Sequence, residues 1–142
     1  MNKDYRELKI YTDGASRGNP GDAAWGYVIL DEQENPVTNQ SGYIGHSTNN
    51  QAEYFAVIRA LQRASELTRA KIHLYSDSQL LVNQVTGAWK VKDDELRRLH
   101  GRVRSLVDQF KEVNFTHLPR ENSHIGEADG LCNDRLDEVQ GD

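Results

Sequence analysis

The hydrophobic period of this chain first changes near residue 50, and the change limits the folds that it can adopt. Residues 7–13, 23–30 and 37–44 have the apolar alternation of β-strands and are joined by short links. Three such strands in succession predict an antiparallel meander. From residue 50 onward, apolar residues recur at i, i+3, i+4 and i+7, which predicts an amphipathic helix over residues 50–65.

Strands and helices alternate in the second half of the chain. The elements expected there are strands over residues 72–76 and 112–117 and helices over residues 78–85, 93–108 and 127–139. A strand that follows a helix usually joins its sheet as a parallel strand, through a right-handed crossover. The order predicts one α/β domain over residues 1–142, with a mixed five-stranded sheet of three antiparallel strands and then parallel strands, flanked by helices.

Composition excludes several classes of protein. The single cysteine, Cys132, rules out an internal disulfide and a zinc site of four cysteines, and it fits a reducing, cytoplasmic setting. No apolar run approaches the ~18 residues of a membrane span, and residues 1–7 do not resemble a signal region, so no membrane is expected. The net charge of -5 argues against a general nucleic-acid binder, but residues 89–104 carry a local basic excess.

Four acidic residues fall at the ends of predicted elements. Asp13 and Asp77 end predicted strands, whereas Glu53 and Asp129 lie in the first turns of predicted helices. Each has a structural alternative: a turn, a helix cap, part of a capping box or a charge favoured by the helix dipole. Grouping four uncompensated carboxylates is costly, which fits a metal site better than a structural cluster. Carboxylate oxygens suit Mg²⁺, whereas cysteine and histidine ligands would indicate zinc.

Five short motifs surround these acids. They are Tyr11-Thr12-Asp13-Gly14, Gly18-Asn19-Pro20-Gly21, Thr48-Asn49-Asn50-Gln51-Ala52-Glu53, Ser76-Asp77-Ser78-Gln79 and Ala128-Asp129-Gly130-Leu131-Cys132-Asn133. In order and spacing they resemble the motifs of type 1 ribonuclease H, over nearly the whole chain. The resemblance implies the ribonuclease H fold and an endoribonuclease that hydrolyses the RNA strand of RNA–DNA hybrids, leaving 5′-phosphate and 3′-hydroxyl ends.

The resemblance also assigns the four acids. It implies that Asp13, Glu53, Asp77 and Asp129 are the catalytic and metal-binding residues, holding two Mg²⁺ ions for which Mn²⁺ can substitute. Asp13 would bridge both ions, Glu53 and Asp77 would complete one site, and Asp129 would help to hold the other. Two divalent ions suit this reaction because they stabilise a highly charged transition state and supply a hydroxide-like nucleophile at neutral pH.

Six further residues match substrate contacts of the family: Asn19, Thr48, Asn49, Asn50, Trp89 and Lys90. The three asparagines would read the minor groove, because an amide can both donate to and accept from base edges and the 2′-hydroxyl. Thr48 would touch a DNA phosphate, and Trp89 with Lys90 would contact the DNA strand. The structural alternatives are a turn for Asn19, helix caps for Asn49 and Asn50, and core packing for Trp89 beside solvated lysines.

Many relatives carry a basic handle that this chain lacks, since the connection after the helix at 78–85 is only about residues 86–92. With a net charge of -5, weak and salt-sensitive hybrid binding is expected.

The expected loop over residues 118–126 also departs from many relatives. Pro119 stands where they have a Gly-flanked histidine, and Pro119-Arg120-Glu121 resembles the loop of other relatives. His124 is a candidate for proton transfer or product release, with no role at all as an equal alternative. His117 is expected to have no role.

Two other functions would also be compatible with this fold. One is a non-catalytic nucleic-acid-binding domain that keeps the fold, which the presence of all four acids disfavours. The other is a nuclease of the same superfamily that acts on DNA, which the asparagines at 19, 49 and 50 disfavour. No protein partner and no separate hybrid-binding domain are expected; a monomer is the default, and the length favours a free enzyme over a domain of a reverse transcriptase.

Overall fold

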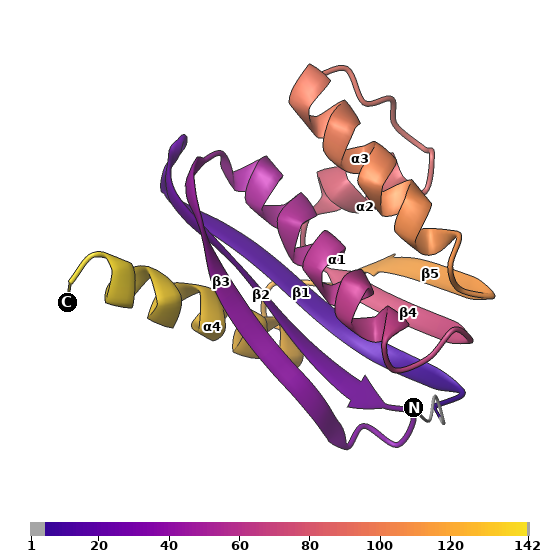
Figure 1. Ribbon diagram of the computed structural model, residues 1–142. Coiled ribbons are helices and arrows are strands. Elements are labelled where there is room, and N and C mark those ends of the chain that lie inside the picture. Colours follow the sequence, from indigo (N-terminus) through magenta and orange to yellow (C-terminus); the bar gives the residue numbers. More distant parts are fainter. Residues whose placement is uncertain (1–4, 142) are drawn as a thin grey trace.

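The computed structural model describes residues 5–141, which form one sheet with helices on both of its faces (Figure 1). The strands are β1 (Glu7–Gly18), β2 (Gly21–Asp31), β3 (Pro36–Ser47), β4 (Lys71–Ser76) and β5 (Glu112–His117). Their order in the sheet is β3-β2-β1-β4-β5. The pairs β1–β2 and β2–β3 are antiparallel, whereas β1–β4 and β4–β5 are parallel. The predicted mixed sheet is therefore confirmed.

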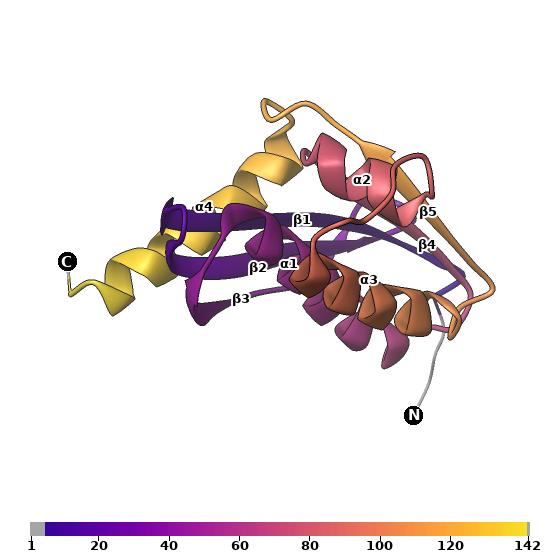
Figure 2. The same ribbon diagram turned by 90° about the horizontal axis from the view of Figure 1, so that it is seen from above.

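Four helices cover the sheet within the described residues: α1 (Asn49–Ser65), α2 (Gln79–Val85), α3 (Asp94–Val107) and α4 (Ser123–Val139). Helices α1 and α3 lie on one face and α4 lies on the other, as Figure 2 shows from above. Between residues 5 and 141, no helix is long and apolar enough to cross a membrane.

The main core lies between the sheet and helices α1 and α3. Its fully buried members include Leu8, Ile10, Ile29, Ile58, Leu61, Ile72, Leu74 and Leu99. Burying a side chain of this size stabilises the fold by about 1.5–3 kcal/mol. A smaller apolar layer under α4 contains Tyr11, Val28, Leu30, Ile125 and Ala128. The two layers fix α1 and α4 on opposite sides of β1.

Strand β1 is longer than predicted. It was expected to end at Asp13, but it continues to Gly18 and pairs in register with β2, so that Asp13 lies opposite Gly26 and Gly18 opposite Gly21. Residues 14–21 therefore belong mostly to the β1–β2 hairpin, and Asp13 lies inside a strand and not at its end. Helix α4 approaches the sheet closely at Gly26, because a Cβ there would lie 2.7 Å from the backbone oxygen of Ala128.

The caps of α1 and α2 differ from the prediction. Thr48 caps α1 in a capping box with Gln51, so neither Asn49 nor Asn50 is the cap. Glu53 lies beyond the first turn and takes no part in that box. Ser78 caps α2, a role that had been the structural alternative for Asp77.

One other expectation and one structural alternative are wrong. Helix α4 begins at Ser123 after the cap Asn122, so Ser123–Gly126 is helical and not loop, and Asp129 lies in the second turn. Asn122 accepts hydrogen bonds from the backbone N–H groups of His124 and Ile125, which starts the helix early. Trp89 is 49% exposed, so it does not pack in the core.

Candidate active site

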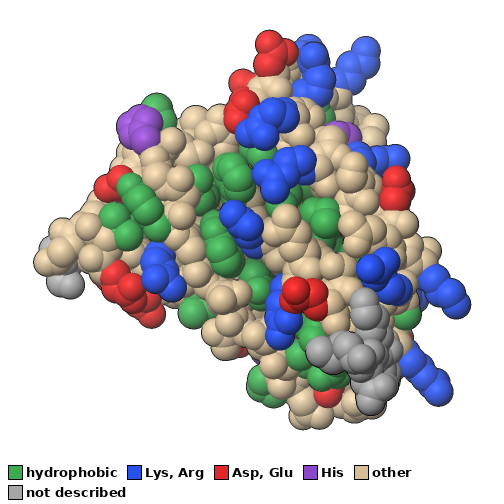
Figure 3. Space-filling view, in the orientation of Figure 1, with side chains coloured by type: hydrophobic (Ala, Val, Ile, Leu, Met, Phe, Trp, Pro, Cys, Tyr) green, Lys and Arg blue, Asp and Glu red, His purple; other side chains and the backbone are tan. Residues whose placement is uncertain are grey.

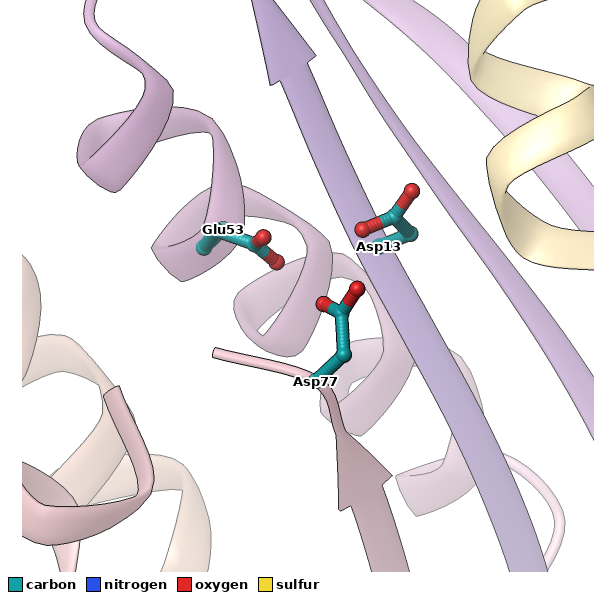
Figure 4. A group of neighbouring side chains, drawn as sticks. All are labelled: Asp13, Glu53 and Asp77. Carbon is teal, nitrogen blue, oxygen red and sulfur yellow. The ribbon is translucent and has the colours of Figure 1, made fainter. Parts of the chain in front are cut away.

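Three acids from different elements meet at the end of α1 where the helix begins (Figure 4). Asp13 comes from β1, Glu53 from α1, and Asp77 directly follows β4. One carboxylate oxygen from each acid lies within 4.8 Å of the other two. Asp13 and Glu53 are each only 5% exposed, so this is a largely buried group of carboxylates.

Glu53 reaches Asp13 because Gly14 lets α1 approach β1 closely. A Cβ at Gly14 would lie 2.2 Å from the backbone carbon of Ala52. At this contact the N–H of Gly14 donates a hydrogen bond of 3.1 Å to Oε1 of Glu53. The bond fixes the Glu53 carboxylate beside Asp13.

Asp129 approaches the same place from α4. It lines a cavity of about 250 Å³ together with the three other acids and Gly14, Ala15, Asn49, Ser78 and Arg120. Helix α4 is held against β1 at this point, where the thiol of Cys132 donates to the backbone oxygen of Asp13 at 3.3 Å. The four acids predicted from the sequence therefore surround one cavity.

The acids raise one another's pKa values. Burial, then the charge of Asp77, then a hydrogen bond with Asp129 raise the pKa of Asp13 from 3.8 to about 9. Burial and the charges of Asp13 and Asp77 hold the pKa of Glu53 well above its usual range. Burial also raises the pKa of Asp77, although Arg120 opposes this shift. The protein alone resists full ionisation of this cluster, which is the property expected of a site for cations.

Arg120 is a site residue that the sequence reasoning did not assign. It lines the acid cavity, and its positive charge lowers the pKa of Asp77. The signal was present in Pro119-Arg120-Glu121, which was read as a departure in the loop and not as a source of a functional side chain. Arg120 places a cation at a cavity otherwise lined by acids and neutral groups.

The predicted substrate residues fall into two groups. Oδ1 of Asn19 accepts a hydrogen bond of 3.0 Å from the N–H of Asn49, which joins the β1–β2 hairpin to α1. Asn49 lines the acid cavity, whereas Asn19, Thr48 and Asn50 line a second cavity of about 200 Å³. Trp89 and Lys90 lie away from both, on the exposed segment between α2 and α3.

His124 does not line the acid cavity. Its Nδ1 lies 2.6 Å from Oε1 of Glu127, and its ring lies 4.8 Å from the ring of Tyr11. A role in proton transfer or product release stays a prediction. His117 is exposed at the end of β5, and its charge slightly lowers the pKa of Asp77.

A larger cavity lies elsewhere and has different chemistry. It measures about 630 Å³ and is bordered by α3 and β5, with Val85, Val103, Val107, Val113 and Phe115 among its walls. Because it gathers no cluster of acids, its size alone does not mark a catalytic site. The smaller acid cavity has the chemistry of one.

Comparison with known proteins shows the family of this chain. The family described as reverse transcriptase-like matches residues 11–134. A ribonuclease H of Acetivibrio thermocellus is 40% identical over 147 residues, which cover 96% of this chain and 94% of that protein. The chain belongs to the ribonuclease H family.

Two further comparisons agree with the family. The ribonuclease HI of Halobacterium salinarum is 45% identical over 132 residues. The match covers 93% of this chain but only 65% of that protein, so this chain spans about two thirds of its length. The crystal structure of LC11-RNase H1 in complex with an RNA/DNA hybrid has a TM-score of 0.87 and a sequence that is 38% identical. The match covers 94% of this chain and 99% of that chain. The predicted family and fold are thereby confirmed.

Proposed function

We propose that the protein is an endoribonuclease that hydrolyses the RNA strand of RNA–DNA hybrids and leaves 5′-phosphate and 3′-hydroxyl ends. The observation that carries this proposal is the convergence of Asp13, Glu53 and Asp77 within 4.8 Å, with Asp129 on the same cavity. No ion pair within residues 5–141 neutralises any of these four acids. Relatives named ribonuclease H, and a related structure solved with a hybrid, support the substrate.

The acid cavity fits divalent metal ions. Its charged ligand atoms are carboxylate oxygens, which Mg²⁺ and Mn²⁺ prefer, and burial together with the neighbouring acids raises the pKa values of Asp13 and Glu53. We infer that Asp13, Glu53, Asp77 and Asp129 would hold two Mg²⁺ ions, replaceable by Mn²⁺. When bound, such ions polarise the phosphate and lower the pKa of a bound water.

The chain's own groups position the substrate around these acids. Asp13 is held in a paired strand, and the Gly14 N–H orients Glu53, so neither carboxylate has to reorganise for the reaction. Arg120, at the rim, attracts the negatively charged backbone. The side-chain oxygen of Asn19 is occupied by the Asn49 N–H, which leaves its amide hydrogens for the hybrid.

The remaining contacts are proposals of the same kind. Asn49 and Asn50 would face the minor groove, Thr48 a DNA phosphate, and the exposed Trp89 and Lys90 the DNA strand. Lys and Arg side chains are spread over the face formed by α1 and α3 (Figure 3), although the total charge of the chain is negative. A monomer acting in the cytoplasm stays a prediction.

Cleavage of a labelled RNA–DNA hybrid with Mg²⁺ tests the proposal. The wild type should cut the hybrid's RNA and leave duplex RNA and duplex DNA intact, and Asp13→Asn should not cut. Asp134→Asn is the matched control, because Asp134 is an exposed acid on α4 outside the acid cavity. Equal cleavage by Asp13→Asn, or cutting of duplex DNA by the wild type, would refute the proposal.

A further inference from the structure

The second cavity, beside the acid site, has an unexpected charge. It is lined by Asn19, Thr48, Asn50, Gln51, Asp93 and Leu96. Asn49 lines the acid cavity and its neighbour Asn50 lines this one, so the first turn of α1 separates the two. A duplex that lies across both would place one strand at the acids and the other at this second cavity.

The neutral side chains of the second cavity present mainly hydrogen-bond donors. Oδ1 of Asn19, Oγ1 of Thr48 and Oε1 of Gln51 each already accept from a backbone N–H, at 3.0, 3.1 and 3.1 Å. The amide or hydroxyl hydrogens of these side chains therefore stay available to donate hydrogen bonds to a ligand. A surface of this kind suits the oxygens of a backbone phosphate.

Asp93 places a negative charge among these hydrogen-bond donors. It is the only charged residue among those described that line this cavity. One carboxylate oxygen caps α3 by accepting a 2.9 Å hydrogen bond from the N–H of Leu96, and no ion pair among residues 5–141 includes it. The next two acids of α3 differ, because Asp94 pairs with Arg97 and Glu95 pairs with Arg98. Figure 3 shows acidic and basic side chains side by side at this end of α3.

We propose that Asp93 is an affinity-setting residue for the hybrid: its carboxylate repels the backbone phosphate that the donors of the second cavity would otherwise hold. This inference rests on the proposed function, because it takes the hybrid as the duplex bound there. It goes further by assigning weak binding to one side chain, and not only to the chain's net charge. The helix cap alone does not require this charge, because Asn and Ser cap a helix about as well as Asp.

Three substitutions separate charge from other effects. Asp93→Asn removes the charge, keeps the cap and adds an amide donor, whereas Asp93→Ser removes the charge without adding an amide. Asp94→Asn is the matched control, because Asp94 is the next residue, its side chain is 96% exposed and it does not line the cavity. Unfolding midpoints of all three variants should stay close to that of the wild type.

Binding of a fluorescent hybrid is measured by anisotropy with Mg²⁺ in an Asp77→Asn background, so that the RNA stays intact. Asp93→Asn and Asp93→Ser should both tighten binding, by about five-fold at 50 mM salt and by less at 200 mM because salt screens the repulsion. Asp94→Asn should change binding by less than about two-fold. With the Asp77 of the wild type restored, both Asp93 variants should lower KM by a similar factor.

Several results would overturn the inference. Equal tightening by Asp94→Asn would show a general charge effect, and tightening by Asp93→Asn but not Asp93→Ser would show a gained donor in place of relieved repulsion. No change, or weaker binding, in both Asp93 variants also refutes it. Failure of the proposed function looks different: the wild type would not cleave, and the anisotropy series would still decide for or against Asp93. Absence of hybrid binding in every variant would refute both.

Discussion

Removal of the Asp13 carboxylate should stabilise the metal-free protein, although it should abolish activity. Burial and neighbouring acids raise the pKa of Asp13 from 3.8 to about 9. Between these two values the folded protein holds a proton that the unfolded chain releases. Stability in the absence of metal should therefore fall as the pH rises through this range.

The size of the effect follows from the same shift. Each unit of pKa difference corresponds to about 1.4 kcal/mol of folding free energy. Neutral pH lies roughly three units above the pKa of Asp13 in the unfolded chain, so the destabilisation by this group is at most about 4 kcal/mol. Asparagine keeps the shape of the side chain and cannot ionise. Asp13→Asn should therefore raise the free energy of unfolding by about 2–4 kcal/mol near pH 7 without metal, and by almost nothing near pH 4.

Urea unfolding followed by circular dichroism, with EDTA or with millimolar Mg²⁺, measures this directly. Mg²⁺ should stabilise the wild type, because it binds the folded state only, and should stabilise Asp13→Asn much less. The exposed Asp134→Asn should behave as the wild type under both conditions. The reasoning fails if Asp13→Asn is less stable than the wild type near neutral pH without metal, or if its gain does not depend on pH.

Three other predictions concern the surroundings of the acids. Gly14→Ala should destabilise the fold by about 3 kcal/mol, because the added Cβ would collide with the Ala52 backbone. Gly101→Ala in α3 should instead stabilise the fold by about 0.5–1 kcal/mol, because a Cβ there meets nothing within 4 Å. Thermal unfolding of the two variants compares these effects. Arg120→Ala should raise KM for the hybrid, and Arg120→Lys should recover part of the loss, in initial-rate assays. Hybrid affinity should fall steeply between 50 and 200 mM salt, and an unchanged dissociation constant would contradict the weak electrostatic binding expected here.

The sequence predicts elements well where the signal is local and less well where pairing decides. The alternation in residues 7–44 and the helical period after residue 50 were sufficient for the sheet and its first helix. The Gly/Asn/Pro-rich segment after Asp13 has the composition of a loop, yet residues 14–18 form a strand because β2 supplies hydrogen-bonding partners along its whole length. No local pattern reports such a partner.

Helix starts were displaced for a related reason. At α1, several residues that can cap stand in a row, and the capping box closes on Thr48 and Gln51 and not on the asparagines that follow. At α4, Gly126 lowers the apparent helix propensity of the first turn, but Asn122 caps the helix and Ile125 is buried under it. The choice of cap therefore decided both helix starts, and burial of Ile125 adds tertiary packing at α4.

The convergence of the acids could be anticipated from the motifs, but its cause lies in backbone contacts. Asp13 is followed by Gly14 and is paired across the sheet with Gly26. At Gly14 a Cβ would lie 2.2 Å from the backbone of α1, and at Gly26 one would lie 2.7 Å from the backbone of α4. The two helices therefore approach the sheet beside Asp13 from opposite faces, α1 at β1 and α4 at β2, and each brings its own acid to Asp13. A carboxylate cluster with this much mutual repulsion needs such enforced approach, because that repulsion alone would drive the four acids apart.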